Sequence, residues 1–288
     1  MKFEGRHGGL DPSQAEYFEV TYDLIAVGDV MLDVLADAVP SAAMHAPVRM
    51  RYSGSAANAA IAAAGERASA AVVGRIGDDT AGVALRAAIE DAGATALLAI
   101  DPDRATGTVV YTGSGVVADR GATAALAPGD LPAALAAGAM LVSGYTLLHA
   151  NTELAGRAAL ERAEAGWIAV DAAATGLLDE SFHRRARGAN AVFANEDEAR
   201  TLTDLDPPEA ALALALRYRL VVVKRGAEGA VAVLDGNLVE VPAPERLSGA
   251  SPGAGDALAA GVLVALVRGA TLVEALREGC RLGTAAAA

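Results

Sequence analysis

Short apolar runs alternate with helical patterns along most of this chain. Runs rich in Val, Ile, Leu and Ala, each short enough for a buried strand, lie at 22–27, 70–76, 140–143, 167–171, 191–194 and 220–223. Ala-rich or amphipathic stretches that favour helices lie at 53–65, 81–92, 151–165 and 256–268, and a further Ala-rich helix follows them. Because strands that alternate with helices form parallel sheets, this pattern predicts an α/β fold with a mostly parallel central sheet.

Two segments depart from this rhythm and read as strands outside the main core. The segment 34–52 carries two prolines in a partly alternating pattern, and 97–122 contains two short β-branched runs around a glycine, as in a hairpin. An Asp-Gly turn at 235–236 predicts another hairpin. We therefore expect one domain over residues 1–288, with 1–20 as a loose leader and a small second sheet built from 34–52 and 97–122.

Composition and charge narrow the function classes. Hydrophobic residues make up 53% of the chain and aromatic residues 4%, so the core must be built mainly from Ala, Val and Leu. A formal net charge of -13 disfavours nucleic acid and anionic membrane surfaces as partners. Cys280 is the only cysteine, which excludes an intramolecular disulfide and a cysteine-based zinc site. No apolar stretch near the start looks like a signal peptide, so we expect a soluble, cytoplasmic protein.

The strongest candidate for chemistry is the loop Gly253-Ala254-Gly255-Asp256, which opens the helix predicted at 256–268. Backbone N–H groups at a helix start attract anions, and small residues leave those groups accessible. Asp256 fits two interpretations, a simple helix cap or a general base beside an anion site. The residues alone leave both open.

A dinucleotide-binding oxidoreductase is a weaker alternative. The segment Gly113-Ser114-Gly115 imitates the glycine fingerprint of such enzymes, but no helix is expected to begin there. A P-loop is absent, because no Gly-Lys-Ser or Gly-Lys-Thr occurs.

Four motifs, in order and at matching places, resemble those of the PfkB (ribokinase-like) carbohydrate kinase family. The segment Gly253-Ala254-Gly255-Asp256 is similar to the end of that family's Asp-Thr-x-Gly-Ala-Gly-Asp signature. The second is Ser53-Gly54-Ser55-Ala56-Ala57-Asn58-Ala59-Ala60, which resembles Gly-Gly-x-x-x-Asn-x-Ala. The others are Gly74-Arg75-Ile76-Gly77-Asp78-Asp79 for Gly-x-x-Gly-Asp-Asp and Asn195-Glu196-Asp197-Glu198 for Asn-x-x-Glu. Together they extend over roughly residues 22 to 286.

The resemblance implies a three-layer αβα fold with a mostly parallel sheet and a small β-sheet lid. It also implies an ATP-dependent kinase that phosphorylates a hydroxymethyl group of a small sugar, with ATP and Mg²⁺ as cofactors. Asp256 would be the catalytic base, and the amides of Gly253, Ala254 and Gly255 would form the anion hole. A homodimer through the lid is a further expectation.

Binding residues follow from the same motifs, position by position. The implied substrate-binding residues are Asp33, Gly54, Asn58 and Arg120, and the implied nucleotide-binding residues are Asn195, Lys224, Gly226, Gly253 and Gly255. Glu198 would act on Mg²⁺ through water. For three of these a plainer interpretation stays open: Asp33 as a solvated strand-end acid, Glu198 as a helix first-turn acid, and Lys224 as a solvated end residue instead of a phosphate contact.

Two departures from the family pattern bear on function. Ala250 stands where relatives carry an Asp that helps hold a monovalent cation, so we do not expect potassium activation. The chain ends soon after Gly283, where relatives continue beside the adenine, so the base pocket is expected to be built differently. Alternatives within the same fold are a nucleoside kinase and a catalytically weak sugar- or nucleotide-binding homologue.

Overall fold

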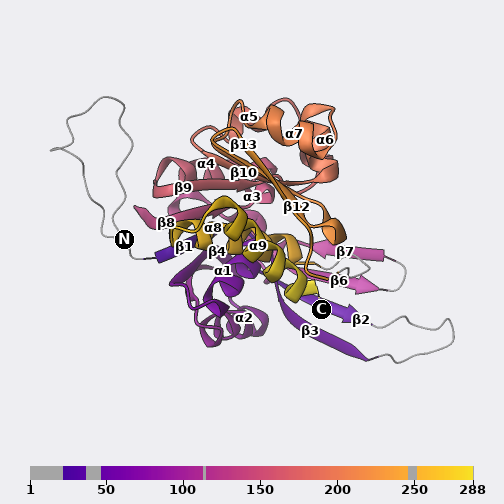
Figure 1. The fold of residues 1–288 in the computed structure, drawn as a ribbon. Helices are drawn as coiled ribbons and strands as arrows, with labels where there is room; N and C mark the ends of the chain where they lie inside the picture. Colours follow the sequence, from indigo (N-terminus) through magenta and orange to yellow (C-terminus); the bar gives the residue numbers. More distant parts are fainter. Residues whose placement is uncertain (1–21, 37–46, 113–114, 246–251, 288) are drawn as a thin grey trace.

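The computed structural model describes residues 22–36, 47–112, 115–245 and 252–287, which form two sheets surrounded by helices (Figure 1). The large sheet has nine strands in the order β13-β12-β11-β10-β9-β8-β1-β4-β5. Their bounds are β1 Tyr22–Val27, β4 Ala70–Gly77, β5 Thr95–Asp101, β8 Leu135–Val142, β9 Ala163–Asp171, β10 Ala191–Asn195, β11 Leu220–Lys224, β12 Ala230–Leu234 and β13 Asn237–Val241. All neighbours from β5 to β11 pair in parallel, which confirms the predicted α/β class.

The hairpin predicted at the Asp-Gly turn is present at one edge of the large sheet. Strands β12 and β13 pair antiparallel, and β12 pairs antiparallel with β11. Asp235 and Gly236 both have positive φ, 49° and 81°. A two-residue turn with positive φ at both positions matches the right-handed twist of its strands.

Helices cover both faces of the large sheet. Their bounds are α1 Ser55–Gly65, α2 Thr80–Asp91, α3 Gly144–Leu148, α4 Glu153–Glu161, α5 Phe182–Arg185, α6 Glu196–Thr203, α7 Pro207–Leu214, α8 Ala254–Val267 and α9 Leu272–Ala287, with short 3₁₀ turns at Gly121–Ala125, Pro128–Asp130, Thr175–Leu177 and Gly226–Glu228. Side chains of β1 alternate between two cores: Leu24 and Ala26 face one, and Ile25 and Val27 the other. This period of two identifies β1 as a strand buried on both faces.

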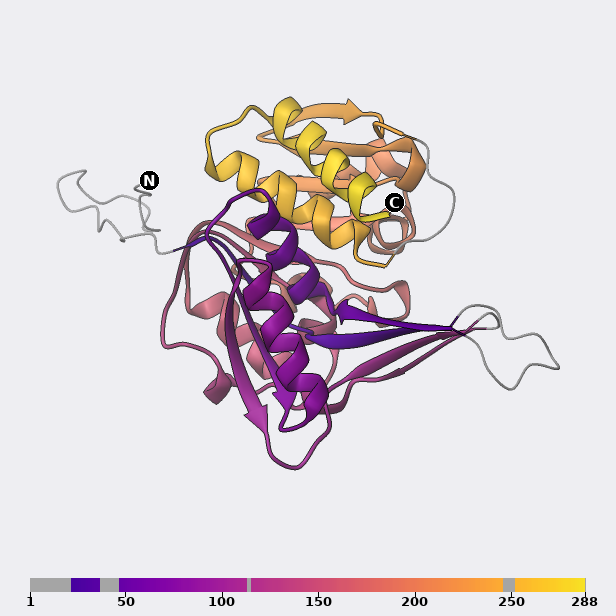
Figure 2. The same cartoon turned by 90° about the horizontal axis from the view of Figure 1, so that it is seen from below.

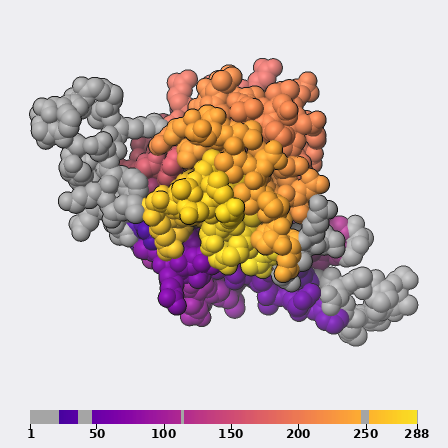
Figure 3. Space-filling model, viewed as in Figure 1, coloured from indigo at the N-terminus to yellow at the C-terminus, as the bar shows by residue number. Residues whose placement is uncertain are grey.

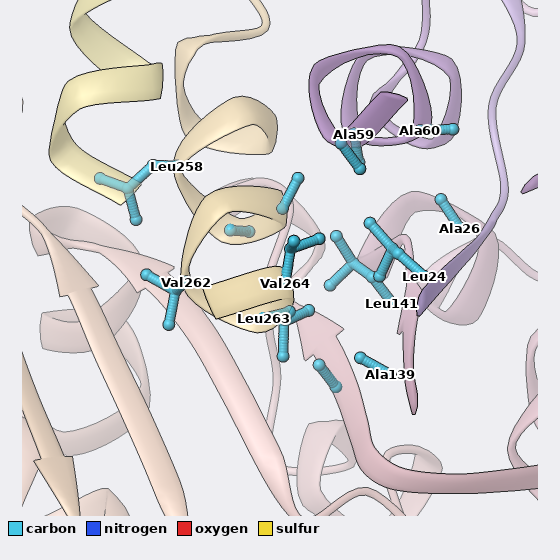
Figure 4. Close-up of a cluster of buried hydrophobic side chains, with 14 of the residues drawn as sticks. Leu24, Ala26, Ala59, Ala60, Ala139, Leu141, Leu258, Val262, Leu263 and Val264 are labelled. Atoms are coloured by element: carbon cyan, nitrogen blue, oxygen red, sulfur yellow. The ribbon is translucent and has the colours of Figure 1, made fainter. Parts of the chain in front are cut away.

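Helix α8 is the centre of the first core and is apolar on almost every side. Leu263 and Val264 point toward Ala139 and Leu141 of β8 and Leu24 of β1 (Figure 4). Val262 lies on the side of α9, since a Cβ built on Gly279 would be 2.5 Å from its Cγ2. On its other side α8 packs closely against α9. The backbones approach at two glycines, and a Cβ built on Gly261 would lie only 3.0 Å from the Cα of Gly279. These C-terminal helices lie on the face shown in Figure 3, between the orange and the indigo parts of the chain. The packing fixes the start of α8, where the candidate chemistry lies.

The small sheet projects from one side of the body (Figure 2). It has the order β3-β2-β6-β7, with β2 Met31–Ala36, β3 Val48–Ser53, β6 Thr108–Thr112 and β7 Gly115–Asp119. Strands β6 and β7 pair antiparallel and Gly115 begins β7 opposite Thr112, so Gly115 opens a strand and not the helix of a dinucleotide-binding turn, while Gly113 and Ser114 lie outside the described residues. The expected extent of this sheet was wrong for 97–101, since β5 pairs in parallel with β4 in the large sheet.

One expected helix is shorter than predicted. Residues 151–165 were expected to be helical, but α4 ends at Glu161 and β9 begins at Ala163. Pairing of Leu135 with Ala163 and of Ala136 with Glu164 overrides the helix preference of these residues. The leader 1–20, the segment 37–46 and Ala250 lie outside the described residues. Within the part of the chain that the structure describes, no helix is long and apolar enough to cross a membrane.

Candidate active site

The site lies at the carboxyl edge of the large sheet. Strand β1 lies between β4 and β8. The strand order therefore runs from β1 through β4 to β5 on one side and from β1 through β8 to β9 on the other. Such a switch point opens a crevice beyond the strand ends, where ligands bind in α/β sheets. Asp29 follows β1, Asp171 ends β9, and Lys224 ends β11. Polar side chains from distant parts of the sequence therefore meet at one edge.

Asp256 occupies the first turn of α8. Gly253 is the N-cap, with φ of 90°, and the amides that follow it lack partners within the helix. Asn58 Nδ2 donates a hydrogen bond of 2.9 Å to Oδ2 of Asp256. Burial raises the pKa of Asp256 to about 7, and the charge of Asp171 adds to the effect against the opposing influence of Asn58 and Lys224. A carboxyl with this pKa is suited to accept a proton near neutral pH.

Asp33 lies inside β2 of the small sheet and not at the end of a strand. Its side chain is 1% exposed, so the interpretation as a solvated acid is wrong. Arg51 Nε donates to Oδ2 at 3.2 Å, while Oδ1 has no hydrogen-bond partner among the described residues. A buried carboxylate oxygen without a partner is costly, and a substrate hydroxyl is the kind of group that would satisfy it.

Arg51 also links the small sheet to the loop before α8. Its Nη2 donates to the carbonyl of Pro252 at 3.5 Å, across 201 positions of sequence. Because Pro252 stands four residues before Asp256, a single guanidinium joins the surroundings of Asp33 to those of Asp256. The sequence predicted that these two carboxylates would serve one site, and the structure brings their segments together.

Gly54 lets two backbone segments approach closely. Its φ is 95°, and a Cβ added there would lie 2.2 Å from the carbonyl oxygen of Asp29. No L side chain fits that position without a backbone shift. Gly54 is also the N-cap of α1, so this contact sets the position of Asn58 one turn later.

Arg120 contacts the end of β1. Its Nη2 donates to Oδ1 of Asp29 at 2.7 Å, and its Nε has no hydrogen-bond partner among the described residues. Burial raises the pKa of Asp29, and Arg120 opposes that rise. Arg120 therefore faces the interior of the site.

Asn195 and Glu198 form a closed pair at the start of α6. Asn195 donates from its backbone N to Oε2 and from Nδ2 to Oε1 of Glu198, each at 2.8 Å, and Glu198 N donates back to Oδ1 at 2.8 Å. Burial raises the pKa of Glu198 to about 7, with a further contribution from Asp171. Both carboxylate oxygens are already engaged, so contact with a metal through water fits this residue better than direct ligation.

Lys224 is paired and nearly buried. Its Nζ donates to Oδ2 of Asp171 at 2.6 Å, and its side chain is 13% exposed. The interpretation as a solvated end residue is therefore wrong. Two residues later Gly226, with φ of 52°, starts a 3₁₀ turn and has open space around its Cα.

The sequence profile of the pfkB family of carbohydrate kinases matches residues 22–288. The chain belongs to this family. Solved structures share its fold: adenosine kinase from Sinorhizobium meliloti (22% identity, 92% of this chain and 93% of that one, TM-score 0.80), PfkB protein from Polaromonas sp. JS666 (26%, 91% and 94%, 0.75), and aminoimidazole riboside kinase from Salmonella enterica complexed with aminoimidazole riboside and an ATP analog (22%, 92% and 93%, 0.76).

Within this pfkB-family site, sequence reasoning gave no role to several residues. Asp171 carried the same signal as Asp29, a carboxylate at the end of a buried strand. Arg51 was visible only as one basic residue in a polar strand. Burial raises the pKa of Tyr145, and nearby Asp29, Glu198, Asp171 and Asp256 raise it further, so the phenol lies among the carboxylates of the site. Nothing in the local sequence around Tyr145 indicates this position.

Proposed function

We propose that this pfkB-family protein transfers the γ-phosphoryl group of ATP to a hydroxymethyl group of a small sugar, with Asp256 as the general base. The observation that carries the proposal is a carboxyl with a pKa of about 7 in the first turn of a helix whose first amides, from Gly253 onward, have no partner within the helix. A base and an anion-binding site within one turn suit phosphoryl transfer, in which a proton leaves as negative charge shifts between oxygens.

The proposed reaction uses groups that converge at the start of α8. Asp256 takes the proton of the acceptor hydroxyl as that oxygen bonds to the γ-phosphorus, and the bond to the ADP oxygen breaks. Amides of Gly253, Ala254 and Gly255 stabilise the charge on the phosphoryl oxygens. Asn58 orients the carboxylate of Asp256 through its hydrogen bond. Positioning of this kind supplies much of the rate in phosphoryl transfer.

Substrate contacts are assigned by the same proposal. Asp33 accepts hydrogen bonds from hydroxyl groups of the sugar through Oδ1, which has no other partner among the described residues. Gly54 lets the main chain approach the same hydroxyl groups. Arg120 borders the same space from the end of β1. On the nucleotide side we assign Asn195, Gly226, Lys224 and the Gly-rich loop.

Magnesium fits the acidic side of this site. Glu198 would hold it through water, as its two oxygens are already bonded to Asn195. The ion would neutralise charge on the phosphates of ATP. We expect no potassium activation, because Ala250 stands where the family pattern has the Asp that helps hold a monovalent cation.

A nucleoside is the second candidate acceptor. Two solved relatives are named as nucleoside-type kinases, adenosine kinase and aminoimidazole riboside kinase. Tyr145 supplies an aromatic side chain close to the carboxylates of the site, against which a base could stack. A free sugar remains our choice, because aromatic side chains that could hold a base are few near the small sheet, chiefly Tyr52 on β3 and Tyr111 on β6.

An ADP-release assay with ATP, Mg²⁺ and a panel of sugars, sugar acids and nucleosides tests the proposal. A thermal-shift screen of the same panel with a non-hydrolysable ATP analogue first selects the acceptors that bind. We expect ADP release that depends on a sugar and falls ~10²–10⁴-fold in Asp256→Asn. Binding of both ligands without turnover would favour the alternative of a catalytically weak binding homologue.

We also propose a homodimer through the small sheet. Its edge strands expose apolar side chains: Val48 and Met50 on β3 are 56% and 69% exposed, and Val116 and Val117 on β7 are 60% and 69%. Exposed edges with apolar side chains favour pairing with a second copy. Light scattering at micromolar concentration should give twice the monomer mass, and Val117→Glu should halve it. A monomeric mass for the unchanged protein would contradict this proposal.

Our prediction for location is the reducing cytoplasm. It is supported by the single cysteine, Cys280, which is buried in α9 and free.

A further inference from the structure

The ammonium of Lys224 lies against the first turn of α8. A Cβ built on Gly255 would be 3.2 Å from Nζ, so the cation lies beside the residue that immediately precedes Asp256. Nζ also donates a 2.6 Å hydrogen bond to Asp171, which ends the strand β9. Lys224 therefore sits between a fixed carboxylate and the proposed catalytic loop.

Charged groups from several elements face Asp256. Asp29 after β1 and Asp171 at the end of β9 repel its negative charge, and Lys224 at the end of β11 attracts it. Asn58 on α1 donates a hydrogen bond to it, and Tyr145 on α3 lies near enough to feel its charge. Glu198 on α6 adds a further negative charge close to Lys224.

We propose that Lys224 is a fixed counter-charge for Asp256, a positioning residue that keeps this carboxylate ionised and able to accept a proton, and that Asp171 holds the ammonium in place. The inference rests on the proposed role of Asp256 as general base. It goes beyond that role because it names what sets the working pH of the base.

The geometry favours this role over a simple surface ion pair. The side chains of Lys224 and Asp171 are 13% and 10% exposed, so solvent screens their charges little. Burial alone would keep Asp256 protonated at neutral pH, because the charged form of a carboxyl loses its hydration. A nearby cation favours the charged form of a carboxyl, and at short range it lowers the pKa of that carboxyl by about 1–3 units.

The test compares the pH dependence of kcat/KM in three variants. Lys224→Met removes the counter-charge, so the acidic limb should move to higher pH by about one unit or more. Asp171→Asn removes the repelling carboxylate and frees the ammonium for Asp256, so the limb should move to lower pH. Lys224→Arg keeps the charge and should leave the limb within a few tenths of a unit of the unchanged protein.

Opposite shifts in two variants of one ion pair are not produced by general loss of packing. If Lys224→Met fails to fold because it leaves Asp171 buried and unpaired, the double variant Lys224→Met/Asp171→Asn, which leaves neither charge unpaired, replaces it, and its limb should lie above that of Asp171→Asn alone. Limbs that stay in place in both variants would overturn the proposal. An unmoved limb in Lys224→Met with only a higher KM for ATP would also overturn it and would leave Lys224 with the nucleotide contact alone.

An NMR titration separates this inference from the proposed function. The side-chain carboxyl signal of Asp256, assigned by its loss in Asp256→Asn, can be followed with pH in the protein without nucleotide. Its midpoint should move up in Lys224→Met and down in Asp171→Asn, whether or not any acceptor is phosphorylated. Absence of ADP release with unchanged protein would reject the kinase proposal, and an unmoved midpoint would reject the role of Lys224.

Discussion

Replacing Asp256 with Asn should stabilise the folded protein at high pH. The ordinary pKa of this carboxyl is 3.8, and the folded protein raises it to about 7, mainly through burial. The folded state therefore binds the proton more tightly than the unfolded chain does. The resulting stabilisation is complete below pH 4, falls between pH 4 and 7, and is gone above pH 7. Asn has nearly the same shape and carries no charge at any pH.

The size of the effect follows from the shift. Three pKa units at about 1.4 kcal/mol each give about 4 kcal/mol as an upper limit. Water reaches this partly exposed carboxylate and the loop can relax, so we expect about 1–3 kcal/mol at pH 8. For a domain of this size the difference corresponds to a Tm higher by about 2–5 °C.

Thermal unfolding of the unchanged protein and of Asp256→Asn should be measured from pH 5 to pH 8. The Tm of Asp256→Asn should exceed that of the unchanged protein by an amount that grows with pH, although the variant has lost turnover. Asp235→Asn is the matched control, since Arg219 holds the pKa of the exposed Asp235 below its ordinary value. Its effect should be small and of opposite sign. A gap for Asp256→Asn that is constant with pH, or a variant less stable at pH 8, would refute the reasoning.

Two further substitutions test how the site is positioned. Gly54→Ala should lower the free energy of unfolding by about 1–3 kcal/mol in chemical denaturation and weaken acceptor binding, because its Cβ meets a backbone carbonyl. The control Gly65→Ala, with no atom within 4 Å of its Cβ, should leave that free energy unchanged or slightly higher. Equal losses in the two variants would contradict the argument. Arg51→Gln should raise KM for the acceptor more than KM for ATP, because it removes the bridge from Asp33 to Pro252; an unchanged acceptor KM in steady-state kinetics would count against that bridge.

The sequence predicts those parts of the fold that depend on local pattern. Strand β1 was readable because its apolar residues are continuous and end at Gly28. The turn at 235–236 was readable because Asp-Gly favours positive φ. The end of α4 could not be predicted, because pairing with β8 decides where β9 begins. A local sequence pattern does not indicate which strand will be the partner.

The same division holds in the candidate site. Asp256, Gly253 and Asn58 were found by short motifs, and the structure joins Asn58 to Asp256 across 198 positions. Asp171 and Lys224 are 53 positions apart, and nothing local indicates that they form a pair. Contacts at such separations depend on the order of strands in the sheet, so their discovery required the three-dimensional structure.

The pairing of charges sets Asp256 apart from Asp29, Asp33 and Asp171. Each cation is matched to one carboxylate: Arg51 with Asp33, Arg120 with Asp29, and Lys224 with Asp171. Among the described residues, Asp256 has no ion-pair partner, and its own hydrogen bond comes from the neutral Asn58. A cation bonded directly to the carboxylate would occupy an oxygen that must take the proton and would favour its charged form. A cation one residue away lowers the cost of ionisation and leaves the carboxylate oxygen available, which is the compromise that a general base requires.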